Sequence, residues 1–566
     1  MDSVERDSTR LWALVARRIW SQTKHRVFGG PIYRWRFAGR TPDRVLIAPP
    51  DLRVADPQLA VEFYHGRFPL AGHLVETGEE SPFQLKVSNG RWLRSLHGFR
   101  WLRHMRAAGS EIAAANARSL VSDWITLHGS RIVGPAWEPA TVAKRIIAWL
   151  QHSSVVLQGA EFAFYRAFLK SLAMQIRYLR AVVPDTPDGA TRLRARAALA
   201  FSALSLPVPP SALRAATRNL AVELKRQILP DGGHVSRDPL VVLEMLADLL
   251  PLRQTYANQA EAPPQELINA VDRMLPALRF FRLGDGAMAR FNGMGATIQD
   301  RILTILRHDD TVGAPLLHAS HSGYERLALG RTVVIADTGA APPFEMSQRA
   351  HAGCLAFEMS SGRNPLIVNS GVDSYASEDF RPLARATAAH STATINDTSS
   401  ARFALQPGMA RWLGTPLVDG PKEVRSTRLD KPGQQGFVAS HDGYLSRFGI
   451  IHERGLRLSD DGAVLTGMDR FFGSGGQKVH REQDAVSIRF HLHPDIELFR
   501  DDGERLVLVT PQHERWTLSS PDVVPTVEES IFFASLGGPL RSRQIVLAFR
   551  ASELGEVRWR FSREGN

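Results

Sequence analysis

Three polar residues, His351, Asn369 and His390, each lie beside a short run of residues that favour β-strands. These runs cover residues 355–359, 366–369 and 392–395, and each is bounded by Gly, Pro, Ser or Asn. Because the runs predict neighbouring strands of one sheet, the three side chains should occupy strand ends or adjoining loops. Such positions are where a rigid sheet presents side chains to a ligand. The spacing therefore predicts that the three residues converge on one site.

Three motifs around these residues follow one another along the chain: AHAGCLAFE at 350–358, LIVNSG at 366–371 and RATAAHST at 385–392. Together they resemble the C-terminal signature of the heparinase II/III-like polysaccharide lyases. In that family the corresponding His, Asp and His bind a divalent metal, usually zinc. The resemblance therefore implies a zinc site at His351, Asn369 and His390. An amide oxygen is a weaker donor than a carboxylate, so Asn369 predicts loosely held Zn²⁺. The alternative is that the three residues only form hydrogen bonds.

Two positions near the motifs suggest catalytic roles. Arg349 stands two residues before His351, where the family usually has another His, and a guanidinium stays charged and cannot take up a proton. Tyr375 falls near the family's conserved Tyr, where a phenol could move a proton to or from a sugar. Packing is the alternative role for this Tyr. The resemblance makes Arg349 and Tyr375 candidate catalytic residues.

The helical part of the sequence keeps one family segment and loses others. The segment Asp231-Gly232-Gly233-His234 is retained, and His234 is a third candidate catalytic residue, with helix capping or packing as its alternative role. The family's Asn-His pair is replaced by Gly189-Ala190-Thr191, and Val241 stands where a Tyr is expected. We therefore expect the family's usual catalytic residues in this part to be absent.

The resemblance implies cleavage of a 4-linked uronic acid by β-elimination. That reaction needs a base for the C5 proton, a group that neutralises the C6 carboxylate and an acid at the departing O4. One hypothesis is a divergent carbon-oxygen lyase acting on an acidic polysaccharide such as a glycosaminoglycan, in which Arg349 pairs with the carboxylate and Tyr375 moves the proton. The other is a relative that binds acidic glycans without lyase activity, because a fold does not guarantee a reaction.

The charge balance favours an acidic partner. The chain of 566 residues has 69 Lys and Arg against 58 Asp and Glu, a formal net charge of +11. Acidic polysaccharide and nucleic acid both display regularly spaced anions that Arg can bind. The sequence lacks zinc-finger spacing, RNP-like strands and Gly-rich phosphate loops, so we do not expect nucleic acid as the partner. The alternative is that the excess of Arg only forms a solvated surface. The oligomeric state is not indicated by the sequence.

The N-terminal sequence bears on the compartment. No secretory signal is evident, which favours a cytoplasmic protein, whereas the family resemblance implies the periplasm or cell envelope as the alternative. No apolar run approaches the length needed to cross a bilayer, so we expect no membrane span. The single cysteine, Cys354, excludes an internal disulfide and lies in an apolar strand pattern, typical of a packed thiol.

The sequence pattern changes from helical periodicity to short strands along the chain. Apolar residues recur at helical spacing in the runs 140–150, 162–183, 192–205, 212–228, 240–256 and 265–281. After residue 284 short strands and turns alternate, including 331–337, 463–467, 486–490 and 545–549. We predict an N-terminal arm at 1–100 with a short strand at 44–48, a helical domain at 101–284 and an antiparallel β-sandwich at 285–566. The helices alone fit a bundle or a toroid, and the resemblance implies an incomplete α/α toroid.

Overall fold

The computed structural model describes residues 34–309, 314–372, 380–404, 413–479, 483–501 and 505–564, with positions 12, 14–16 and 20. The chain forms two compact units. The helical unit comprises Met1–Ile228, Leu243–Asp272 and Asp300–Asp310, and the sandwich unit comprises Leu229–Val242, Arg273–Gln299 and Thr311–Asn566. Two segments from the middle of the helical sequence therefore belong to the sandwich unit. The boundaries at 100 and 284 and the arm at 1–100 stay predictions.

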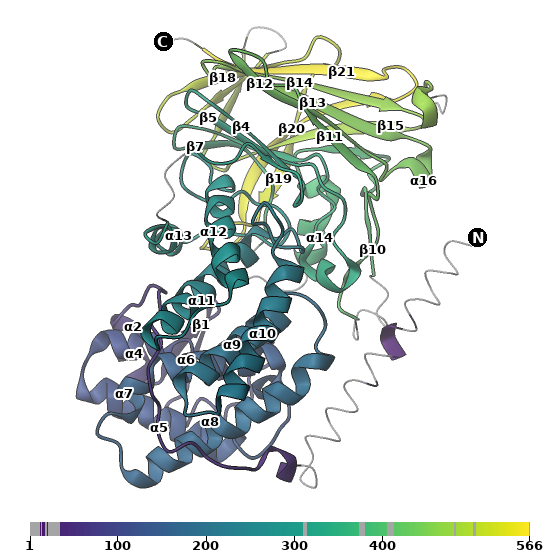
Figure 1. The fold of residues 1–566 in the computed structure, drawn as a ribbon. Coiled ribbons are helices and arrows are strands. Elements are labelled where there is room, and N and C mark those ends of the chain that lie inside the picture. Colours follow the sequence, from purple (N-terminus) through teal and green to yellow (C-terminus); the bar gives the residue numbers. More distant parts are fainter. Residues whose placement is uncertain are drawn as a thin grey trace. The chain divides into compact units, whose positions relative to one another are not determined.

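The N-terminal part is built from α-helices joined by short connections (Figure 1). They are α2 (Gln58–Tyr64), α3 (Gly90–His97), α4 (Leu102–Ala108), α5 (Glu111–His128), α6 (Pro139–Gln151), α7 (Ser153–Leu157), α8 (Phe162–Val182), α9 (Ala190–Ser205), α10 (Pro210–Gln227), α11 (Pro239–Asn258), α12 (Gln265–Phe280) and α13 (Gln299–Leu306). All six predicted helical runs are confirmed. Trp149 on α6 stacks on Phe168 of α8 with ring centroids 4.9 Å apart, so aromatic packing joins these helices.

The predicted strand at 44–48 is wrong. This segment has no strand assignment and bends at Leu46, and the strands before α3 are β1 (Arg67–Leu70) and β2 (His73–Glu76) in the described residues. The amide of Leu46 donates to the carbonyl oxygen of Ser205, the last residue of α9, at 2.8 Å. Pro49 and Pro50 follow and have no amide hydrogen to donate to a neighbouring strand. The β-prone residues therefore lie against a helix end.

The sandwich unit contains two antiparallel sheets. The larger follows the order β19-β20-β15-β7-β6-β5-β4-β3, with β8 also paired to β15. Its strands are β3 (His318–Ala319), β4 (Tyr324–Leu329), β5 (Thr332–Asp337), β6 (Phe357–Ser361), β7 (Asn364–Val368), β8 (Ala393–Ile395), β15 (Ala485–Leu492), β19 (Thr526–Phe532) and β20 (Leu540–Arg550). The three strands predicted beside His351, Asn369 and His390 correspond to β6, β7 and β8. They lie in this one sheet, as expected.

The second sheet follows the order β11-β12-β13-β14-β21-β18-β17-β16. Its strands are β11 (Val424–Arg428), β12 (Gln434–His441), β13 (Ile451–Ser459), β14 (Val464–Phe472), β16 (Glu497–Arg500), β17 (Leu506–Val509), β18 (Arg515–Ser519) and β21 (Glu556–Arg563). A separate pair, β9 (Arg402–Phe403) and β10 (Leu417–Asp419), lies outside both sheets. Trp559 on β21 stacks on Phe357 of β6 with centroids 5.7 Å apart, so the core lies between the sheets. The predicted β-sandwich is confirmed.

A charged group lies in this otherwise apolar core. Asp469 occupies an inward position of β14 directly opposite Arg454 of β13, and both side chains are fully buried. The Arg454 Nε donates to Asp469 Oδ1 at 2.7 Å, and the indole N–H of Trp559 donates to Asp469 Oδ2 at 2.8 Å. Burial alone would raise the pKa of Asp469, but the Arg454 guanidinium and the His452 ring hold it below its usual range. Asp469 is therefore an anion in the folded protein.

We expect Asp469→Asn to destabilise the sandwich by about 3–5 kcal/mol, because the variant leaves the buried Arg454 cation without its counter-ion. Urea unfolding followed by tryptophan fluorescence would measure the loss. The matched control is Arg470→Met on the same strand, which breaks the more exposed pairs of Arg470 with Glu453 and Glu556. It should cost less than about 1 kcal/mol. Equal unfolding midpoints for the two variants would contradict this role of the buried pair.

Candidate functional site

His351 and His390 lie against each other in the sandwich unit. His351 follows the 3₁₀ turn η4 (Phe344–Arg349), and His390 follows η6 (Thr387–Ala389) and precedes β8. The Nδ1 atom of His351 is 2.9 Å from Nε2 of His390, and the rings meet edge to face. A Cβ atom on Gly353 would lie 2.7 Å from Cδ2 of His390, so a glycine is needed there for the His390 ring to pack.

Asn369 is the first residue after β7, and its side chain bonds mainly to backbone. Its Oδ1 accepts the amide hydrogen of Ser391 at 3.0 Å, and its Nδ2 is 3.4 Å from the carbonyl oxygen of Arg290. The amide of Asn369 donates to Oε1 of Glu358 at 2.8 Å, and Glu358 forms a buried ion pair with Arg290. Asn369 thus contacts the residue after His390, while the two His rings contact each other.

Asn292 links the histidine pair to a second part of the site. Its Oδ1 accepts the amide hydrogen of His351 at 3.0 Å, and its Nδ2 donates to the carbonyl oxygen of Arg237 at 2.9 Å and contacts the Tyr324 hydroxyl at 2.8 Å. Asn292 has a φ of 51°, a left-handed conformation that Asn adopts more readily than most residues. The sequence analysis did not select Asn292, although the Asn-Gly pair at 292–293 is a turn signal.

Arg349 is held in place by two partners. Its Nε lies 3.1 Å from Oδ2 of Asp238, which is almost fully buried, and its Nη2 donates to the carbonyl oxygen of Gly293. The Arg349 side chain keeps 44% of its surface exposed. Asp238 was missed from sequence, although its position before Pro239 at the start of α11 is a helix-start signal, and its Oδ1 accepts the amide hydrogen of Leu240. Asp238 therefore fixes one side of an exposed guanidinium.

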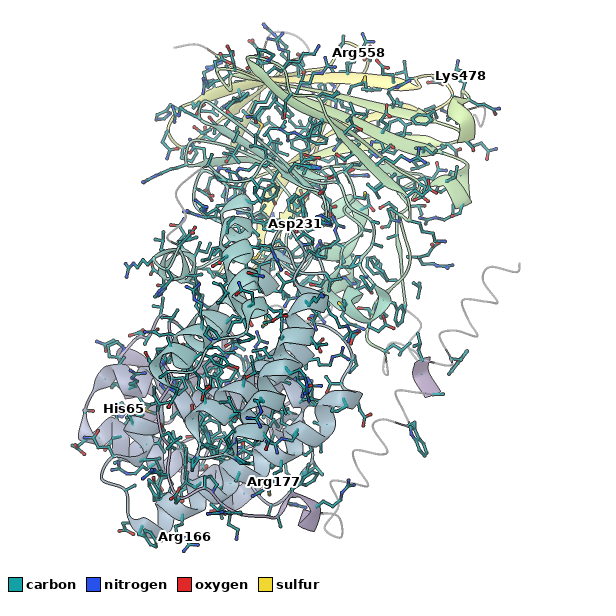
Figure 2. All side chains as sticks on the ribbon, in the orientation of Figure 1. His65, Arg166, Arg177, Asp231, Lys478 and Arg558 are labelled. Atoms are coloured by element: carbon teal, nitrogen blue, oxygen red, sulfur yellow. The ribbon has the colours of Figure 1, made fainter. Side chains whose placement is uncertain are left out.

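His234 lies in a tight turn next to Asp238 in sequence. Its Nδ1 is 2.7 Å from the Ser236 hydroxyl and accepts the Ser236 amide hydrogen at 3.0 Å. Oδ2 of Asp231, which is among the residues labelled in Figure 2, accepts hydrogen bonds from the amide and hydroxyl of Ser322 at 2.7 and 3.1 Å. Gly232 has a φ of 82°, which explains the glycine there. The retained Asp-Gly-Gly-His segment thus forms a turn fixed to the sandwich unit.

Burial keeps the site histidines neutral. Burial lowers the pKa of His234 to about 3 and that of His390 to about 4, the latter against the opposing effect of the Ala386 carbonyl. Burial, followed by the nearby His390 and Arg385, holds the pKa of His351 well below its usual value. The charged side chains near these histidines are therefore carboxylates and guanidinium groups, and Arg349 is more exposed than Arg290, at 44% against 7%.

Arg385, the last residue of α14 (Arg381–Arg385), joins two segments of the site by hydrogen bonds. Its guanidinium donates to the carbonyl oxygens of Ser347, Ala350 and Thr415 at 3.1, 2.7 and 2.7 Å. It also lies over the Phe403 ring, 4.4 Å from the centroid. Because η4 and the residue before His351 both accept from Arg385, this side chain sets where Arg349 and His351 lie.

The donor set fits zinc only in part. The two imidazoles are suitable ligands, and the Ala386 carbonyl, 2.7 Å from Nδ1 of His390, orients that ring as an outer-shell acceptor does. The third donor is a neutral amide oxygen that already accepts a backbone hydrogen bond from Ser391. Among the described residues there is no group of three His, Cys, Asp or Glu placed to hold a metal ion. The residues therefore suit a weakly held ion at most.

The six predicted site residues have different outcomes. The structure brings His351 and His390 into contact, bonds Asn369 to the neighbouring Ser391 and places Arg349 against Asp238. His234 lies in the turn that leads to Asp238. Tyr375 falls outside the described residues. Their catalytic and metal-binding roles stay predictions.

Known relatives extend over nearly the whole chain. FtsZ-localized protein C of Caulobacter vibrioides (strain NA1000 / CB15N) is 29% identical over 561 residues, covering 98% of this chain and 96% of that protein. No helix in the described part of the chain has the length and apolar character needed to cross a membrane.

Solved structures share the fold. Heparinase III matches with a TM-score of 0.69 at 14% identity, covering 97% of this chain and 91% of that one. Heparan sulfate lyase HepC from Pedobacter heparinus matches with a TM-score of 0.61 at 17% identity, covering 98% and 88%. The fold is thus an N-terminal helical, toroid-like region followed by a β-sandwich. The family model described as heparinase II/III-like, C-terminal, matches residues 311–560. The sandwich region of this chain, residues 311–560, thus matches the heparinase II/III-like C-terminal family.

Proposed function

We propose that this chain binds an acidic, uronate-containing polysaccharide beside Arg349 and cleaves it by β-elimination. The observation that supports this most is the geometry of Arg349, whose guanidinium is fixed by Asp238 and Gly293 while nearly half of the side chain stays exposed. A cation held in this way loses little side-chain freedom when it pairs with a carboxylate. The lyase family of the sandwich domain supplies the reaction class.

In the proposed reaction Arg349 pairs with the C6 carboxylate and stabilises the negative charge that develops when C5 loses its proton. Tyr375, ionised to its phenolate, takes that proton and returns it to the departing O4, while the C4–O4 bond breaks and a C4=C5 double bond forms. His234 is buried with its Nδ1 bonded to Ser236, so in this mechanism it shapes the turn that carries Asp238. No step depends on a metal.

The same geometry supports a second candidate, an acidic-glycan-binding protein without lyase activity. His234, His351 and His390 are all buried, and Nδ1 of His234, Nδ1 of His351 and both ring nitrogens of His390 bond to one another or to nearby residues. None of these three bases is therefore presented to a polysaccharide. The family's Asn-His pair and second Tyr are also missing from the sequence, so elimination depends on Tyr375 in this chain.

Two variants separate binding from cleavage. We expect Arg349→Ala to weaken binding of acidic oligosaccharides by up to about 1.5–3 kcal/mol and to leave neutral ones unaffected, because a charge-assisted contact is lost. Tyr375→Phe should bind nearly normally but form unsaturated uronate more slowly, since the hydroxyl matters mainly while protons move. Calorimetry measures binding, and ultraviolet absorbance of the new double bond measures cleavage.

The control for both variants is Arg425→Ala, which removes an exposed Arg of β11 paired with Glu423. It should change neither readout. If wild-type protein binds acidic glycans but yields no unsaturated product, the binding-protein alternative holds. If Tyr375→Phe leaves a demonstrated elimination rate unchanged, another residue moves the proton.

We also propose that His351, His390 and Asn369 hold Zn²⁺ weakly. When bound, the ion would be structural and would keep the loops that carry the two histidines together. Asn369→Asp should raise zinc affinity because a carboxylate adds negative charge, and His390→Ala should lower it. Calorimetric zinc titration and melting with added zinc or chelator test both effects. Wild-type and Asn369→Asp proteins that show no zinc-dependent change would exclude the metal site.

A cytoplasmic location is the last part of the proposal. The relative with 29% identity carries a name that describes localisation to FtsZ, and its similarity covers nearly the whole of both chains. We expect a fluorescent fusion of this chain to coincide with labelled FtsZ in dividing cells. Export of the fusion to the periplasm would contradict this location and would agree with a role on envelope polysaccharide.

A further inference from the structure

A cluster of charged side chains lies in the helical unit, where several elements converge. Asp248 on α11 is almost fully buried and pairs with Arg53, with Arg100 at 3.3 Å and with Arg194 of α9 at 2.8 Å. Glu244, one turn earlier on α11, pairs with Arg194 at 2.7 Å and lies 3.7 Å from Arg100. The two carboxylates thus hold three guanidinium groups in fixed positions.

Lys144 of α6 adds a further cation to this cluster. It packs beside Gly98, because a Cβ atom on that glycine would lie 3.6 Å from Cβ of Lys144. Its ammonium group interacts electrostatically with Arg100, Arg194 and the two carboxylates of the cluster. Among the residues that the structure describes, it forms no hydrogen bond or ion pair within 4.0 Å, and its side chain is partly exposed.

Cations outnumber anions in this cluster. The cationic side chains are Arg53, Arg100, Lys144 and Arg194, and the carboxylates are Asp51, Glu244 and Asp248. Burial, together with Arg100 and Arg194, lowers the pKa of Lys144 to about 7. Lys144, which has no ion pair within 4.0 Å among the described residues, is therefore held near Arg100 and Arg194, and an added anion would relieve the repulsion between these like charges.

Exposure shows which side of the cluster a ligand could reach. The Asp248 and Arg194 side chains are 1% and 8% exposed, whereas those of Arg100 and Glu244 are 21% and 35% exposed. Asp248 and Arg194 thus form the buried part of the cluster. Arg100 and Lys144, which carry hydrogen-bond donors, are partly exposed to solvent. A guanidinium and an ammonium that belong to one cluster suit one carboxylate or sulfate group.

We propose that Arg100 and Lys144 bind one carboxylate or sulfate group of an acidic glycan. The substrate class in this inference rests on the proposed function, whereas the anion site itself rests on the cluster. Glu244 limits the site, because its carboxylate repels a ligand that carries several closely spaced charges. A single uronate carboxylate or a single sulfate ester therefore fits better than a polyphosphate.

The experiment measures binding of sulfate and of glucuronate to the full chain, by calorimetry and thermal shift at constant ionic strength set with chloride. Lys144→Met is the test variant, because Lys144 has no ion pair to lose. Lys225→Met is the control, since Lys225 is an exposed lysine in the last turn of α10. We expect saturable binding in wild type and Lys225→Met, and at least a tenfold weaker affinity in Lys144→Met. Without an anion, Lys144→Met should melt at the wild-type temperature or above it.

A sulfated and a carboxylated oligosaccharide are then compared on the same proteins. A tenfold loss for only one of them in Lys144→Met identifies the group that the site recognises. If wild type binds acidic oligosaccharides and Lys144→Met binds them and the free anions equally well, this inference is overturned and the proposed function stands. If no acidic oligosaccharide binds wild type but sulfate binding still depends on Lys144, the proposed function fails and the anion site stands.

Discussion

The ion pair between Arg454 and Asp469 fixes the sandwich and the candidate site at once. Asp469 neutralises the guanidinium inside one sheet, and Arg454 Nη1 donates across the core to the carbonyl oxygens of Leu355 and Ser391 at 2.9 and 2.8 Å. Those residues precede β6 and β8 of the other sheet, and Ser391 follows His390. A neutral side chain of similar length would lack donors for both carbonyl groups. The cost of burying a charge is thus offset by bonds that position the site.

Arginine is used repeatedly as a buried donor to backbone in this chain. Arg145, Arg237, Arg326 and Arg385 each donate to two or more carbonyl oxygens. Part of the formal charge of +11 therefore lies inside the protein and cannot attract an acidic partner from solution. Attraction of an acidic ligand depends instead on exposed arginines, of which Arg349 is the example at the site.

Local patterns predicted most of the secondary structure, because helical and strand periodicity depend on residues close together in sequence. The strand predicted at 44–48 was wrong for the same reason, because an irregular run without a strand partner can have the composition of a strand. Contacts such as Asn292 with His351, or Asp238 with Arg349, join residues 59 and 111 positions apart. No residue near Asp238 in the sequence indicates that Asp238 pairs with Arg349. The three motif residues were found because the family signature already contains that long-range information.

The discontinuous make-up of the sandwich unit limits how it can be divided. Arg237, from the first inserted segment, donates to the carbonyl oxygens of Ser322, Gly323, Gly339 and Ala340 and pairs with the buried Asp337. A gene fragment that begins at residue 311, where the family match begins, would lack Arg237 and leave Asp337 without its counter-ion. The recognisable domain in sequence is thus smaller than the unit that can fold, and recombination between relatives at that border would separate a charge from its partner.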